Sequence, residues 1–162
     1  MPPAWLPETI TIDPNFDKAW ADLYQEFRNN ILNGHLQLRD HPVWLEKKQD
    51  PDGYEELFWH LISKKDETTG DRLFDHHRAR KLPWCSAVIT NSHEPEVKAW
   101  SYMEGKRKTR VYLWLEERDY LIVLEPTCRS NGLPAYYLAT AYDTSGASTH
   151  KSLNRKYGNR LP

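Results

Sequence analysis

The sequence predicts one α+β domain in which helices come first and a mainly antiparallel sheet of four to five strands follows. An apolar stripe at helical spacing begins near Phe16. After Trp84 the chain changes to short apolar or alternating segments separated by turn signals, which is typical of paired strands. The 162 residues suit a single domain, with an N-terminal arm and helical part over 1–53 and an α+β core over 54–162.

One clear helix is expected in the N-terminal part, after an extended arm over residues 1–12. Asp13-Pro14-Asn15 supplies a capping side chain and a proline that the first turn of a helix tolerates. Gly34 marks the expected end of the helix. The stripe that predicts this helix consists of Phe16, Trp20, Leu23, Phe27 and Ile31. Residues 35–53 show no regular pattern beyond a short helical turn around Val43–Lys48.

The middle of the chain combines an ambiguous segment with a basic helix. Residues 54–65 fit either a short helix or a strand from about Leu57, and we favour the strand. Either period places His60 and Lys64 on the same side. Residues 71–82 predict a helix that Pro83 ends, with basic residues in its last turns.

The remainder of the chain predicts strands and a basic tail. Glu104-Gly105-Lys106 is a hairpin signal, and the continuously apolar run YLIVLE predicts a central strand. The tail, residues 148–162, contains four Lys or Arg and no Asp or Glu. The expected strands are Trp84–Thr90, Val97–Met103, Arg107–Leu115, Tyr120–Glu125 and Ala135–Tyr142.

Composition and charge narrow the functional class. No apolar run approaches the roughly 18 residues of a membrane span, and the first residues do not form a secretory signal, so we expect a cytoplasmic protein without a membrane partner. Cys85 and Cys128 fit neither a metal site nor a disulfide framework. Residues 1–60 carry 5 Lys or Arg against 11 Asp or Glu, whereas residues 61–162 carry 17 against 12. The basic C-terminal part indicates either an anionic ligand or a solvated surface.

The side chains available for chemistry favour metal-free cleavage of RNA. The seven histidines show no metal-binding spacing such as HExxH, and we expect no metal and no cofactor. No phosphate-binding glycine loop and no GxSxG motif occur. When the 2′-hydroxyl of RNA attacks the adjacent phosphorus, the protein must supply a proton acceptor, a proton donor and cations. Histidine titrates in the range required, and arginine and lysine bind phosphate oxygens.

Four segments resemble the barnase–EndoU–colicin–RelE superfamily of ribonucleases, in particular its phage-associated and toxin-like branches. These segments are FWHLISKK, DHHRARKLPW, YLIVLE and YYLATAY with its basic tail, and together they cover residues 54–157. The resemblance implies that His60 is a general base or acid and that Arg78 and Arg80 hold the scissile phosphate. Thr140 would contact a phosphate oxygen, and Tyr142 would support it or stack on a base.

The same resemblance implies roles for further residues. Lys64, Lys81 and Lys151 would bind substrate, while the second acid or base stays open among His76, His77 and His150. The expected function is a toxin-like or phage-associated endoribonuclease whose partners are RNA and a cognate antitoxin or immunity protein. The alternative is a non-catalytic protein that uses the same basic face to bind nucleic acid or another protein.

Overall fold

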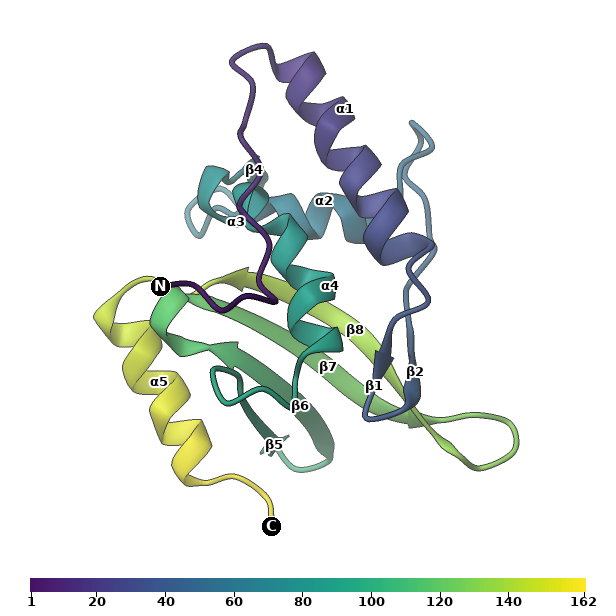
Figure 1. Ribbon diagram of the computed structural model, residues 1–162, viewed down its shortest axis with the longest axis vertical. Helices are drawn as coiled ribbons and strands as arrows, with labels where there is room; N and C mark the ends of the chain where they lie inside the picture. The colour runs from purple at the N-terminus through teal and green to yellow at the C-terminus, as the bar shows by residue number, and fades with distance from the viewer.

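The computed structural model describes residues 1–162 and confirms an α+β architecture (Figure 1). A mixed six-stranded sheet has the strand order β1-β2-β8-β7-β6-β5, and a separate two-stranded sheet pairs β3 with β4. Neighbours in the large sheet are antiparallel except β2 and β8, which run parallel. The strands are β1 (Gln37–Leu38), β2 (His41–Trp44), β3 (Ser63–Lys65), β4 (Arg72–Phe74), β5 (Lys98–Glu104), β6 (Lys108–Leu115), β7 (Tyr120–Cys128) and β8 (Pro134–Asp143).

Helices cover both faces of the large sheet, unequally. The helices are α1 (Phe16–Phe27), α2 (Glu56–Ile62), α3 (His76–Arg80), α4 (Leu82–Thr90) and α5 (Ala147–Gly158), with a π-helical turn at Arg28–Leu32 and a 3-10 turn at Glu116–Arg118. The first four lie together on one side of the sheet, whereas α5 lies apart from them (Figure 1). The large core contains apolar residues of α1, α2 and α4 packed on Leu113, Ile122 and Leu138. The smaller core places Leu153 of α5 against Trp114 and Val123 on the opposite face.

The expected first helix is present and begins where its capping residues predict. The Asn15 side chain accepts hydrogen bonds from the backbone N–H groups of Asp17 and Lys18, which would otherwise lack partners. Leu23 and Phe27 are fully buried, so the apolar stripe of α1 faces the core. The helix continues through the π-helical turn and ends before Gly34.

Two segments predicted as strands are helices. Residues 56–62 form α2, and only Ser63 to Lys65 extend as β3. The predicted strand Trp84–Thr90 belongs to α4, whose buried residues lie on one face. The opposite face carries Pro83, Ala87 and Thr90, which differ too little in polarity from the buried residues to reveal a helical period. Pro83 stands in the first turn of α4, where a missing N–H costs nothing, so it begins a helix rather than ending one.

The predicted helix over residues 71–82 is shorter than expected. Residues 72–74 form β4, which pairs with β3, and Asp75 then caps α3 by accepting from the backbone N–H groups of His77 and Arg78. The segment 35–53 was predicted to be irregular, but it contributes β1 and β2 to the sheet edge. The sheet consequently has six strands instead of the four to five expected.

The four C-terminal strands match their predicted positions, whereas the predicted tail forms α5. Leu153 is the only fully covered side chain of α5, so too few apolar residues mark this helix in the sequence. Leu153 and Tyr157 of α5 pack in the smaller core on the sheet, and polar contacts add to this packing: His150 approaches Asp119 in the turn before β7, and Lys156 binds Glu104 at 2.7 Å. No helix of the structure has the length and apolar character that crossing a membrane requires.

Candidate functional site

Arg78 contacts two other predicted site residues, Tyr142 and His60. Its guanidinium group lies over the ring of Tyr142, with 5.5 Å between Cζ and the ring centroid. One terminal nitrogen of the same group donates a hydrogen bond to the carbonyl oxygen of His60 at 3.0 Å. Burial lowers the pKa of Arg78, yet an arginine side chain stays charged at neutral pH. Arg78 therefore holds a positive charge between the end of α2 and the end of β8.

His60 presents its imidazole to solvent at the last turn of α2. Partial burial of the ring lowers the pKa of His60 below its usual value, and the positive charges of Arg72 and Arg78 lower it further against the opposing effect of Glu56. Arg72 is placed here by the β3–β4 pairing, with its side chain bonded to the hydroxyl and carbonyl of Ser63. An imidazole with a lowered pKa is neutral at pH 7 and can accept a proton.

A cleft of about 450 Å³ opens beside Arg78. The residues that line it are Lys64, Glu67, Asp75, His77, Arg78, Tyr142, Asp143, Ser145 and Thr149. Two of its three carboxylates are already engaged, because Asp75 caps α3 and Asp143 binds Lys81. The groups left free for a ligand thus include cations, an imidazole and hydroxyls, together with one exposed carboxylate.

Thr140 lies on the sheet face that Tyr142 occupies. Thr140 pairs with Val123, and Tyr142 pairs with Leu121, both of which belong to the smaller core on the α5 side. A shift of register beside Val123 inserts one extra residue in β8 before Thr140, so Leu138 faces the large core although it lies two residues from Thr140. Burial raises the pKa of the Tyr142 hydroxyl, with Arg78 acting in the opposite direction. Tyr142 therefore stays protonated and can donate a hydrogen bond.

Lys81 was predicted to bind substrate, and its burial contradicts that role. Only 4% of the residue is exposed. Its ammonium group donates to Asp143 at 2.6 Å and to the carbonyl oxygens of Arg118 at 2.9 Å and Asp119 at 3.2 Å. All three of its donors are used, so Lys81 ties α3 and α4 to the sheet and has none left for a ligand.

Four other predicted residues do not line the cleft, namely His60, Thr140, Arg80 and Lys151. Arg80 follows Arg78 by two positions on α3, so their side chains diverge by about 200° around the helix. The carbonyl of Arg80 accepts from the N–H of Ile10 in the N-terminal arm. Lys151 is exposed on α5, but it does not line the cleft. Lys64 does line it.

The structure separates the three histidines that the sequence leaves open as second acid or base. His77 lines the cleft with Arg78 and Tyr142. His76 packs its ring against Phe74. His150 contacts the Asp119 carboxylate and the ring of Trp114. His76 and His77 both line a neighbouring hollow of about 660 Å³ together with Lys64 and Glu67, and of the two only His77 also lines the cleft beside Arg78.

The remaining reactive groups do not form a second centre. No cluster of three or more His, Cys, Asp or Glu side chains in the chain could hold a metal ion. Cys85 is buried, and burial raises the pKa of its thiol to about 12. Cys128 is exposed at the end of β7. Neither cysteine lines the cleft.

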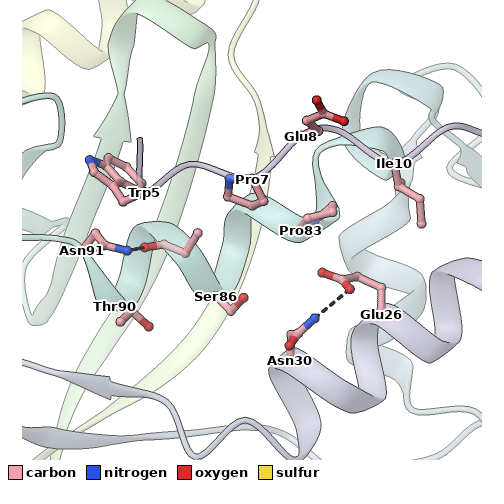
Figure 2. A pocket seen from close by; sticks show the side chains of 11 residues that line it. Trp5, Pro7, Glu8, Ile10, Glu26, Asn30, Pro83, Ser86, Thr90 and Asn91 are labelled. Carbon is pink, nitrogen blue, oxygen red and sulfur yellow. Dashed lines mark hydrogen bonds between the residues drawn. The ribbon is translucent and has the colours of Figure 1, made fainter. Parts of the chain in front are cut away.

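A different hollow lies between the N-terminal arm, α1 and α4 (Figure 2). Its lining contains Trp5, Glu8, Glu26 and Asn30 but no histidine, lysine or arginine. Asn30 donates to Glu26 at 2.7 Å, so part of its polar surface is already satisfied. This hollow lacks the acid, base and cations that phosphate chemistry requires, and the cleft beside Arg78 is the candidate site.

Comparisons with known proteins identify no relative: no protein-family model matches the chain, and neither a curated protein nor a solved structure is significantly similar to it.

Proposed function

We propose that the protein is a metal-independent endoribonuclease and that His60, Arg78, Tyr142 and Thr140 form its site. The observation that most supports this proposal is the position of Arg78, which lies over Tyr142 and binds the backbone of His60. Arg78 thereby connects the end of α2, which carries His60, to the end of β8, which carries Thr140 and Tyr142. The site so assigned contains an imidazole, a guanidinium and two hydroxyls. These are the groups that cleavage by the 2′-hydroxyl needs.

The proposed reaction divides the roles as follows. Neutral His60 accepts the proton of the 2′-hydroxyl while the 2′-oxygen forms a bond to the adjacent phosphorus. The bond from phosphorus to the 5′-oxygen breaks, and His77 supplies the proton that this oxygen takes up. Arg78 and Lys64 stabilise the negative charge that grows on the phosphate oxygens. The products carry a 2′,3′-cyclic phosphate and a 5′-hydroxyl.

The electrostatics of His60 support its role as the base. Its lowered pKa keeps the ring neutral at pH 7, whereas a usual histidine is partly protonated near that pH. Arg72 and Arg78 both favour the neutral form. The same two cations would become partners of the phosphate once RNA binds.

Incubation of the purified protein with end-labelled RNA in the presence of EDTA tests the proposal. We expect cleavage, with products that end in a 2′,3′-cyclic phosphate, and no cleavage of an oligonucleotide whose 2′-hydroxyl is missing at the cut position. Loss of activity in EDTA, or cleavage of the 2′-deoxy substrate, would overturn this mechanism. Salt-sensitive RNA binding without any turnover would favour the non-catalytic binding protein instead.

The biological setting of the proposed activity rests on the sequence resemblance alone. A toxin-like or phage-associated role, and an antitoxin or immunity protein as partner, stay predictions. Growth arrest when the wild-type protein is expressed, but not when the His60→Ala variant is expressed, would support the toxin-like role.

A further inference from the structure

Arg110, like Arg78, has a buried side-chain nitrogen that forms no hydrogen bond. The Nε atoms of Arg78 and Arg110 are both inaccessible to solvent and form no hydrogen bond. A buried donor without an acceptor costs roughly 1–3 kcal/mol, so such atoms are rare in native proteins and call for an explanation. Arg78 belongs to the proposed site, and Arg110 has no assigned role there.

Strand geometry places Arg110 on the same sheet face as the site. Val111 and Leu113 of β6 point into the large core, so Arg110 and Tyr112 point to the α5 side. Thr140 and Tyr142 occupy that face of β8. Arg110 stands opposite Tyr102 in the register of β5 and β6, and its side chain is 30% exposed. A ligand lying on this face can therefore reach it.

Positive charge predominates around Arg110. Glu125 is shared between Lys108 at 3.0 Å and Arg110 at 3.4 Å. Glu104 is engaged by Lys156 at 2.7 Å. Three cations, Lys108, Arg110 and Lys156, here face two carboxylates, both of which already have partners. An anion placed here would meet an excess of one positive charge.

Arg110 is too distant along the sheet to share the phosphate of Arg78. Trp114 of β6, Leu121 of β7 and Tyr142 of β8 stand in one row across the sheet. Arg110 precedes Trp114 by four residues, which is about 13 Å along the strand, and β6 lies about 10 Å from β8. Arg110 and Arg78 therefore stand at two separate positions relative to Tyr142.

We propose that Arg110 binds a second phosphate of the substrate, so that the site takes an RNA strand of several nucleotides. This inference rests on the proposed ribonuclease function. The scissile phosphate lies at Arg78, and a phosphate further along the same strand lies at Arg110. The Nε atom is inaccessible, but the side chain is 30% exposed and contacts Glu125 at 3.4 Å through a terminal nitrogen, so the terminal nitrogens can bind phosphate oxygens.

Kinetics on substrates of two lengths test the assignment. In the Arg110→Gln variant, kcat/KM should fall roughly tenfold or more on a pentanucleotide and stay unchanged on a dinucleotide that contains a single phosphate. Arg107→Gln, an exposed arginine without an ion pair at the hairpin tip three residues away, is the matched control and should change neither value. Equal losses on both substrates, or no loss on either, would overturn the inference.

A binding measurement separates this inference from the nuclease proposal. Fluorescence anisotropy with an uncleavable 2′-deoxy oligonucleotide gives the dependence of log Kd on log salt concentration. Arg110→Gln should reduce that slope by about 0.7, the value for one phosphate contact on a single strand, and Arg110→Lys should restore it. An unchanged slope in a variant that keeps its melting temperature contradicts the inference, even if RNA is cleaved. A reduced slope supports it, even if no RNA is cleaved.

Discussion

At the scale of single residues, the site depends on cations held close to an imidazole. Arg72 and Arg78 both hydrogen-bond near the end of α2, and both disfavour a proton on His60. Arg78 also keeps a buried nitrogen without a partner, which costs stability. Such costs are common where a side chain is positioned for a ligand rather than for packing.

The titration of His60 is the first prediction at this scale. NMR of the imidazole should give a pKa below its usual value of 6.5, and Arg72→Gln should raise that pKa because one cation is removed. The folded protein then binds this proton less tightly than the unfolded chain. The contribution of His60 to the free energy of unfolding is complete above pH 6.5 and falls as the pH drops toward the folded pKa.

A comparison of two proteins isolates this effect. The wild type should lose more stability than His60→Gln between pH 7 and pH 5, as measured by urea unfolding. A titration midpoint above 6.5, or a wild type that gains stability relative to the variant on acidification, contradicts the electrostatic account of His60.

At the scale of elements, one buried ion pair fixes the helices to the sheet. Lys81 stands between α3 and α4, Asp143 ends β8, and the carbonyls of Arg118 and Asp119 belong to the turn that leads into β7. Burial alone would raise the pKa of Asp143, but hydrogen bonds from Lys81 and Ser145 outweigh it and lower this pKa. The pair therefore positions Arg78 of α3 over Tyr142 of β8.

Removal of the lysine from this pair should be costly. Lys81→Met removes the cation paired with the Asp143 carboxylate and the donor to the Arg118 carbonyl, while Ser145 still bonds Asp143 and Thr144 still bonds the Asp119 carbonyl. We expect a loss of about 3–5 kcal/mol in the free energy of unfolding because a buried charge loses its counter-charge. Urea unfolding measures this loss. Arg80→Met, at the exposed neighbouring position, is the control and should change stability by no more than about 0.5 kcal/mol. Equal effects of the two substitutions would show that the ion pair is not a structural tie.

The sequence predicted an element correctly where its apolar residues recur at a regular spacing or form a continuous run of strand length. Strands β5 to β8 alternate or are continuously apolar, and the stripe of α1 is regular, so these predictions were confirmed. The outer face of α4 carries small, weakly polar residues, so its short apolar run does not distinguish helix from strand. Helix α5 has the reverse problem, since Leu153 is its only buried residue and too few apolar residues mark the helix in the sequence.

The candidate site was only partly predictable for a related reason. Thr140 and Tyr142 share a face by strand alternation, which the sequence reveals directly. Arg72 and Arg110 reach the same surface through strand pairing, and His77 reaches it through the direction of a short helix, neither of which is local in sequence. Lys81 was wrongly assigned to substrate because burial depends on the packing of distant segments.

At the scale of the whole molecule, the sheet separates two kinds of surface. The face under α1, α2 and α4 is the large apolar core, whereas the α5 face contains the smaller core together with Thr140 and Tyr142. His60 and Arg78 of the site come from α2 and α3. Residues 1–60 carry a net charge of −6 and residues 61–162 one of +5. The proposed RNA-binding surface belongs entirely to the basic part of the chain, apart from His60.

The rate of RNA cleavage under single-turnover conditions in EDTA tests the central claim most directly. Compared with the wild type, His60→Ala should slow cleavage by about 10²–10⁴-fold and Arg78→Gln by about 10²–10³-fold. His93→Ala, an exposed histidine in the loop between α4 and β5, should cleave at the wild-type rate. Wild-type rates in correctly folded His60→Ala and Arg78→Gln proteins would contradict the assignment of this site.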